Sequence, residues 1–551
     1  LSALTKGLAA EASVSFDNIG GMNETTNKEY RYMNSNASIT SDGTLVTTPA
    51  IYGTDSETLG HTQPFERLML RSDFQAKVDY NRTFGKHQVG GALIYDMQSV
   101  VKNGRNNSQK NQSVLVNATY TYDNRYSLNA VFNRSGSAYL PDGDKCSNYP
   151  AVSAAWIISN EAFMEKVTPI NLFKIRASYG LSGWDGNLSH ELWRQSYGSG
   201  GAGYNFGVNA GGQSGGSEGD LPVIGLVAEK SQKATFGFDL AAFDNRLNAT
   251  VEGFYEKRSD ILVSGANSTS GIIGITVGQV NEGIYKYKGV DASLSWNDKI
   301  GDFHYGIGAS MSYLNTEVVN VNQAYQEYDY LYTKGNRIGQ MYGLEAIGFF
   351  NSQQEINNSP QQTFSDVAPG DVKYKDQNGD NRIDEKDIVK MFGSSVPRFY
   401  FGFNLNFSYK RLELSADFQG MTGVTVSLLN SPLYSPLVSN GNISNTFLNE
   451  EINWTPENKT NATMPRLTTQ ENLNNYRASS LWYRDGSFLK LRNLLVAYTF
   501  PKSQTRFADL KVFVQGTNLF SLDNIHFADP EQLGIAYPST RSYWAGIKLN
   551  F

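Results

Sequence analysis

Apolar and polar residues alternate along most of this chain. In residues 73–80, every second side chain is apolar, and the side chains between them are the polar Asp73, Gln75, Lys77 and Asp79. A period of two is typical of a β-strand with two different faces. The same period recurs in later segments, namely 114–122, 126–132, 236–255, 290–296, 399–418 and 543–551. The pattern therefore predicts an all-β protein built from antiparallel hairpins.

The connections between these segments are of two kinds. Short polar turns are expected at Asp123-Asn124, Asp244-Asn245 and Lys410-Arg411, whereas 183–230 and 424–479 are long. Short turns at one end and long loops at the other are typical of outer-membrane barrels, whose strands also run about ten residues and carry aromatic side chains near their ends. A soluble sandwich, propeller or solenoid would also alternate, but we find no fixed repeat length. We expect a transmembrane antiparallel β-barrel segment of roughly fourteen to sixteen strands.

The composition excludes several other classes of protein. The 551 residues carry a formal charge of −6, which gives no basic surface for nucleic acid. No run of 18 apolar residues is present, so we expect no transmembrane helix. Cys146 is the single cysteine, which excludes an internal disulfide and a cysteine zinc site. The chain starts without an initiator Met or a signal peptide, and we expect it to be a piece of a longer protein.

An acidic stretch, residues 376–387 (the acidic loop), has the ligand spacing of a twelve-residue calcium loop. Asn381 stands where a glycine is usual, and it tolerates the left-handed conformation needed there. The flanking residues do not resemble the helices of a calcium sensor, so a bound ion would stiffen a loop. The alternative is an ion-free turn stabilised by Asp and Asn side chains. The candidate ligands are Asp376, Asn378, Asp380, Arg382 (through its carbonyl), Asp384 and Asp387.

The Gly-rich loop at 183–220 carries aromatic residues, which suggests a binding surface. Sugar rings stack their apolar C–H faces on aromatic side chains, so an oligosaccharide is one candidate ligand. The alternative is an exposed flexible loop with no ligand. The candidate substrate-binding residues are Trp184, Trp193, Tyr197, Tyr204 and Phe206.

No pattern in the sequence indicates an enzyme. The five histidines lack metal-ligand spacing, and neither a Gly-x-Ser-x-Gly motif nor a phosphate loop is present. The pair Glu450-Glu451 is better explained as loop charge than as a glycosidase pair. We expect no catalytic residues and no catalytic cofactor.

Seven segments together resemble the SusC/RagA family of TonB-dependent transporters from the outer membrane of Bacteroidota. They include "NYPAVSAAWIISNEAFM" (148–164), "LFKIRASYGLSGWDGN" (172–187) and "DGSFLKLRNLLVAYTFPKS" (485–503). The others are 243–262, 338–356, 370–384 and 510–524. The terminal Phe551 is similar to the aromatic end of outer-membrane barrels. The resemblance implies that residues 1–551 form the C-terminal majority of a roughly 22-stranded barrel, with the plug, the TonB box and the first strands absent from this chain.

The resemblance also implies a function and partners. It implies TonB-dependent import of an oligosaccharide or a peptide across the bacterial outer membrane under a SusD-like lipoprotein lid. The expected partners are that lipoprotein, TonB, membrane lipid including LPS, and a second copy in a SusCD-type dimer of heterodimers. Two alternatives stay open, a TonB-dependent siderophore or vitamin receptor and an outer-membrane adhesin or structural barrel.

Overall fold

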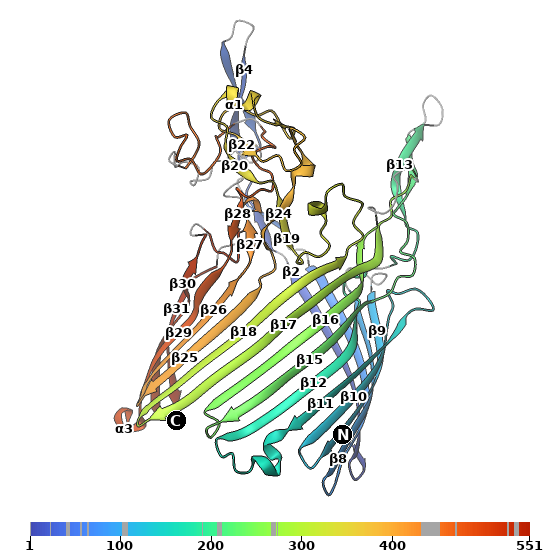
Figure 1. The fold of residues 1–551 in the computed structure, drawn as a ribbon, viewed down its shortest axis with the longest axis vertical. Coiled ribbons are helices and arrows are strands. Elements are labelled where there is room, and N and C mark those ends of the chain that lie inside the picture. Colours follow the sequence, from blue (N-terminus) through green and yellow to red (C-terminus); the bar gives the residue numbers. More distant parts are fainter. Residues whose placement is uncertain are drawn as a thin grey trace.

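One antiparallel sheet forms the body of the protein and is rolled into a barrel-like wall (Figure 1). The computed structural model describes residues 2–551 except 23, 40–43, 56–57, 63–64, 102–107, 190, 206–211, 266–271, 273, 431–451, 469–470, 526–527 and 534–538. The sheet holds seventeen strands, of which β1 has only four residues. Without β1 the count agrees with the strand number expected from the sequence.

The strands pair in chain order, so that each lies beside the one before it and the one after it. Among the described residues, no pairing joins the first strand to the last. The strands are β1 (Ser2–Thr5), β2 (Leu8–Met22), β7 (Phe65–Phe84), β8 (His87–Val101), β9 (Ser108–Tyr122), β10 (Tyr126–Ser137), β11 (Cys146–Ile157), β12 (Ile170–Trp184), β15 (Glu229–Ala242), β16 (Leu247–Ser264), β17 (Gln279–Ile300), β18 (Phe303–Asn320), β25 (Phe399–Tyr409), β26 (Leu412–Thr422), β29 (Phe488–Phe500), β30 (Asp509–Asp523) and β31 (Ser542–Asn550).

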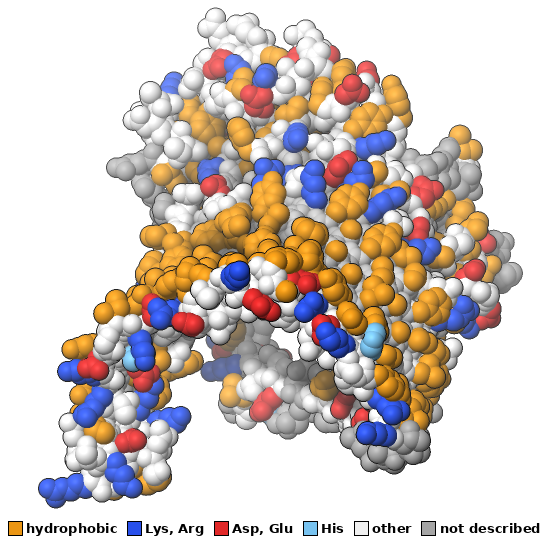
Figure 2. Space-filling view, turned by 60° about the horizontal axis from the view of Figure 1, so that its bottom comes forward, with side chains coloured by type: hydrophobic (Ala, Val, Ile, Leu, Met, Phe, Trp, Pro, Cys, Tyr) orange, Lys and Arg blue, Asp and Glu red, His pale blue; other side chains and the backbone are white. Residues whose placement is uncertain are grey.

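The pairing register aligns the alternating residues of neighbouring strands into common faces. Val78 lies opposite Leu93, and Leu93 lies opposite Val116, so these three side chains share the outer face. They are 42%, 51% and 45% exposed, which is high for large apolar residues in a folded sheet. Figure 2 shows apolar side chains gathered in a band around the barrel wall. This band is the surface expected to face lipid, and the polar set that includes Asp73 faces the lumen.

The short turns lie where the sequence placed them. Asp123 and Asn124 both have φ of 52°, and Asp244 and Asn245 have φ of 57° and 62°. Positive φ at two successive positions is the geometry of a type I′ hairpin turn, which Asp and Asn tolerate. These turns gather at one end of the barrel, where both termini and the short helix α3 (Lys502–Thr505) also lie (Figure 1). In outer-membrane barrels this end is periplasmic.

The opposite end carries the long loops, two of which project as β-hairpins (Figure 1). One hairpin pairs β4 (Tyr32–Ile39) with β5 (Leu45–Tyr52), and it is flanked by the pair β3 (Thr25–Asn27) and β6 (Gly60–Thr62). The other pairs β13 (Tyr197–Asn205) with β14 (Gly212–Glu218) within the Gly-rich loop. The 3₁₀ turns η2 (Ile158–Asn160) and η3 (Ala162–Met164) lie instead between β11 and β12. Among the described residues, no helix has the length and apolarity needed to cross a membrane.

Two long loops fold together above the barrel into what we call the distal module, residues 321–398 and 452–487. The first loop contributes η6 (Asp329–Leu331), β19 (Gln340–Gly343), β20 (Ala346–Phe349), α1 (Gln353–Asn357), β21 (Gln361–Gln362), β22 (Val372–Tyr374), β23 (Arg382–Ile383), η7 (Glu385–Asp387) and β24 (Val389–Ser394). The second contributes β28 (Tyr483–Asp485), which pairs with β27 (Thr425–Ser427) beside η8 (Leu428–Asn430). Most of the fully buried large side chains of the described chain belong to this region, including Trp482, Tyr374 and Phe350.

Candidate functional site

The lumen wall carries a cluster of charged side chains on neighbouring strands. Lys174 Nζ and Arg176 Nε, both on β12, each lie 3.4 Å from Asp239 Oδ2 on β15. Thr250 Oγ1 on β16 donates a hydrogen bond of 3.1 Å to the other oxygen of Asp239, and Arg176 also pairs with Glu252. Period-two alternation holds these side chains on the inner face. The wall therefore offers both charge signs and hydrogen-bonding groups to a hydrated solute.

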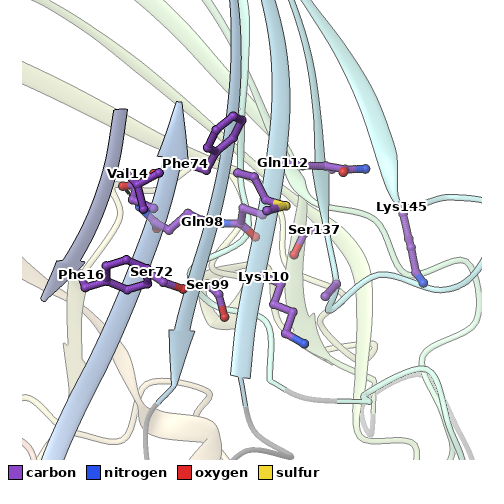
Figure 3. Close-up of a pocket in the computed structure, with 15 residues that line it drawn as sticks. Val14, Phe16, Ser72, Phe74, Gln98, Ser99, Lys110, Gln112, Ser137 and Lys145 are labelled. Atoms are coloured by element: carbon purple, nitrogen blue, oxygen red, sulfur yellow. Dashed lines mark hydrogen bonds between the residues drawn. The ribbon is translucent and has the colours of Figure 1, made fainter. Parts of the chain in front are cut away.

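A groove of about 590 Å³ lies on the outer face at the long-loop end. Two rows of side chains cross it from strand to strand, and Figure 3 shows Phe16, Ser72, Ser99 and Lys110 along one of them. Val14, Phe74 and Met97 lie on the next row towards the short-turn end. These residues have the parity of the lipid-facing set, so the groove does not open into the lumen.

The aromatic residues of the Gly-rich loop do not form one platform. Trp184 ends β12 and is 55% exposed, and Tyr197 begins β13 and is 74% exposed. Trp193 instead packs against a small apolar cluster formed by Leu140, Leu188, Val223, Leu226 and Ala228, and the Arg194 guanidinium lies 4.3 Å from its ring centre. Trp184 and Tyr197 are thus accessible to a ligand, whereas Trp193 anchors the base of the loop.

The remaining two residues of that set are only partly described. The backbone of Tyr204 lies in β13, opposite Gln213 of β14. Phe206 lies outside the described residues. The binding role of all five aromatic residues stays a prediction.

The acidic loop is closed by its own side chains. Asp376 accepts hydrogen bonds from the backbone N–H groups of Gly379 (2.7 Å) and Asn381 (2.9 Å), and Asn381 has φ of 60°, as its position predicts. Asn378 Oδ1 accepts from the N–H of Asp380 at 3.0 Å. Asp380 Oδ1 in turn accepts from the N–H of Arg382 at 2.9 Å. The predicted strand-like flank is confirmed, because β22 precedes the loop and β24 follows it.

The last two candidate ligands fix the end of the acidic loop. Asp384 accepts from the N–H of Lys386 at 2.8 Å. Asp387 is fully buried and accepts from the N–H groups of Gln377 and Asp384, each at 2.8 Å. Within the described chain, no three His, Cys, Asp or Glu side chains gather closely enough to hold a metal ion. Calcium binding by the acidic loop stays a prediction.

The distal module contains a buried polar network that our sequence reasoning missed. Asp371 is fully buried and accepts hydrogen bonds from Arg466 (2.7 and 3.2 Å), Asn472 (3.0 Å), Asn475 (2.9 Å) and the N–H of Ala368 (2.7 Å). Five donors on one carboxylate satisfy a charge that burial alone would penalise. The only signal in the sequence was the Asn-rich run 472–475, which nothing linked to an aspartate a hundred residues away.

The same network is extended by two backbone contacts and a tyrosine. Asn475 Oδ1 accepts from the N–H of Val372 at 2.9 Å, and Gln362 Oε1 accepts from the N–H of Tyr374 at 2.8 Å. Tyr374 donates its hydroxyl hydrogen to the carbonyl of Asn474 at 2.7 Å, and burial raises its pKa. The module is therefore held by directional bonds as well as by apolar packing.

Near α1, Glu355 links the helix to the strand beside it. Its carboxylate accepts from the N–H of Asn351 at 2.9 Å and pairs with Lys373 Nζ at 3.0 Å. The hydrogen bond from Asn351, followed by the contact with Lys373, lowers the pKa of Glu355, although burial opposes the shift.

Known proteins similar to this chain are TonB-dependent receptors. TonB-dependent receptor P26 of Formosa agariphila is 28% identical over 461 residues, which cover 78% of this chain and 45% of the relative. TonB-dependent receptor SusC of Bacteroides thetaiotaomicron is 22% identical over 468 residues, which cover 78% of this chain and 43% of the relative. No family model matches the chain. The chain spans about half the length of the curated relatives it matches.

A solved structure is similar over the whole chain. The RagAB peptide transporter superposes with a TM-score of 0.73 at 18% identity, covering 100% of this chain and 60% of that one. At this identity the likeness establishes the fold, an outer-membrane β-barrel with long loops at one end. The sequence matches and the barrel together show that this chain is similar to TonB-dependent receptors, SusC among them, and that it has the fold of an outer-membrane β-barrel.

Proposed function

We propose that this chain is the barrel wall of a TonB-dependent importer that carries an oligosaccharide or a peptide across the outer membrane. The observation that carries the proposal is the match to TonB-dependent receptors along more than three quarters of the chain. The polar lumen wall supports it, because the ion pairs of Lys174 and Arg176 keep the passage hydrated. The similar proteins are receptors and transporters, and we propose no catalytic role.

The complete mechanism needs parts that we assign to the rest of the protein. A plug would close the lumen, and a TonB box would couple the plug to the energised inner membrane. A SusD-like lipoprotein would cover the long-loop end and hand the nutrient to the lumen. The exposed rings of Trp184 and Tyr197 lie at that end and would contact the nutrient as it enters.

The test is affinity purification of the protein from native outer membranes in mild detergent, with mass spectrometry and N-terminal mapping. Recovery of a SusD-like lipoprotein together with plug and TonB-box peptides is the expected result. Recovery of this chain alone, with no plug sequence, would contradict active import.

A transport assay then separates the substrate classes. Cells that lack the gene should lose uptake of either labelled peptides or labelled oligosaccharides, and a protonophore should abolish uptake in the parent strain. A Trp184→Ala, Tyr197→Ala double variant should raise the concentration needed for half-maximal uptake. The matched control is Phe392→Ala on the distal module, because Phe392 is an exposed aromatic residue as well but lies on β24, away from the Gly-rich loop.

Two other functions give different results in the same assays. A siderophore or vitamin receptor would transport a metal chelate or cofactor, and neither peptide nor oligosaccharide uptake would depend on it. An adhesin or structural barrel would show a sealed lumen and no response to the protonophore.

A further inference from the structure

Two lysines lie directly opposite each other on neighbouring strands. Lys257 of β16 pairs in register with Lys286 of β17, and Lys288 follows two residues later, opposite Tyr255. Directly opposed side chains in an antiparallel sheet have their Cβ atoms about 4.5–5.5 Å apart, and like charges in that position are destabilising. The barrel therefore holds an arrangement that favours a negatively charged partner. We call Lys257, Lys286 and Lys288 the lysine patch.

The lysine patch faces away from the lumen. Val290 and Leu294 have the same parity as Lys286 and Lys288 on β17, and they are 37% and 52% exposed. Tyr255 has the parity of Lys257 on β16 and is 45% exposed. Because these apolar neighbours belong to the lipid-facing band, the lysines lie on the membrane side of the wall.

The height of the lysine patch matches the edge of the apolar band. Trp296 lies near the short-turn end of β17 on the same face, and Lys286 is ten residues away from it. Ten residues span about 33 Å of strand, which at a tilt of about 40° is a rise of about 25 Å, the height of the lipid-facing band of such barrels. The ammonium groups therefore lie at the level of lipid headgroups on the long-loop side.

The nearby protein charges do not neutralise the lysine patch. Glu317 of β18 is the residue opposite Lys286, and Asn315 is opposite Lys288. In the part of the chain that the structure describes, none of the three lysines forms an ion pair, whereas Lys230 on the next strand is paired with Asp260 at 3.1 Å. Three lysines beside one glutamate leave a formal charge of +2.

We propose that the lysine patch binds the phosphate groups of an anionic lipid in the outer leaflet. A phosphate offers several strong acceptors and at least one negative charge, so one group between Lys257 and Lys286 would turn their repulsion into two charge-assisted hydrogen bonds. The acyl chains would then run along the apolar side chains below, including Val290 and Leu294. Lipid rather than free phosphate is the ligand because the patch borders the apolar band. The inference does not depend on what the barrel transports.

The experiment is native mass spectrometry of the complete protein in detergent, titrated with lipid A that carries its phosphates, with dephosphorylated lipid A and with inorganic phosphate. Each lysine near an anionic surface contributes about fivefold in affinity. A triple variant with Lys257→Gln, Lys286→Gln and Lys288→Gln should therefore bind phosphorylated lipid A about a hundredfold more weakly. Dephosphorylated lipid A and inorganic phosphate should bind the wild type no better than they bind this variant.

A second variant separates binding from folding. Lys257→Glu creates an opposite-charge pair with Lys286, so the barrel should resist heat in a gel-shift assay at least as well as wild type. Its affinity for phosphorylated lipid A should nevertheless fall. The control is Lys299→Gln with Lys410→Gln and Lys502→Gln, which removes three charges at the short-turn end and should leave binding unchanged. Equal binding by all variants, equal binding of dephosphorylated lipid, or displacement by inorganic phosphate would each overturn the proposal.

Discussion

Replacing Asp371 by Ala should open the distal module while the barrel stays folded. The substitution removes the acceptor of five hydrogen bonds, including both from Arg466, whose side chain is only 28% exposed. Breaking a buried ion pair by removing one partner costs about 3–5 kcal/mol. Each 1.4 kcal/mol changes an equilibrium constant tenfold. The population of the open module should therefore rise by roughly 150- to 4,000-fold.

Hydrogen exchange measures this opening directly. The N–H groups of Val372 and Tyr374 are bonded to side chains of the network, so their exchange should accelerate by the factor given above. Amides of β10 in the barrel wall should keep their rates. The matched control is Glu385→Gln, because Glu385 pairs with Arg477 at 2.9 Å in the same module but its own side chain is 64% exposed. An exposed pair contributes about 0–1 kcal/mol. Equal exchange in the Asp371→Ala and Glu385→Gln variants would refute the reasoning.

Three further predictions concern the acidic loop, a carboxylate and the faces of the barrel. If the acidic loop binds calcium, added calcium should slow its proteolysis in wild type and not in Asp376→Ala; no calcium effect in wild type would reject the site. Because the folded pKa of Glu355 lies below its unfolded value of about 4.3, its stabilisation of α1 is present at neutral pH and is lost as pH falls through the folded pKa. The protection of the α1 amides, which is their exchange rate relative to the intrinsic rate at the same pH, should therefore fall in acid, and Glu355→Gln should remove that pH dependence. Leu93→Lys on the outer face should destabilise the barrel in lipid vesicles by about 2–4 kcal/mol, whereas Gln75→Lys on the lumen face should be tolerated; equal effects would mean that the faces are assigned wrongly.

The barrel could be predicted because the residues that define each strand and each short turn are close together in the sequence. Alternation at a period of two assigns every residue of a strand to a face, and a short turn fixes the register of the two strands it joins, as at Asp123 and Asn124. Leu128 therefore lies opposite Tyr120 on the outer face, as the pattern requires. Nothing beyond neighbouring residues is needed for that inference.

The parts that sequence reasoning missed depend on contacts between distant segments. Asp371 and Asn475 are 104 residues apart, and no local pattern shows that they meet. The hairpin β13–β14 has few apolar side chains, so alternation gives no signal, although backbone hydrogen bonds still pair the two strands. Trp193 was grouped with exposed aromatic residues because composition cannot distinguish a ring that packs inward from one that does not.

The way the distal module is built has a consequence for the order of folding. Its two loops follow β18 and β26. In an unfolded chain, bringing Asp371 and Asn472 together would close a loop of about a hundred residues, which costs conformational entropy. Pairing of β18 with β25 and of β26 with β29 already holds the four loop ends side by side, which leaves little entropy to lose. The network around Asp371 should therefore form last, after these strands have paired and inserted into the membrane. A buried Asp371 would thus be a marker of completed barrel assembly.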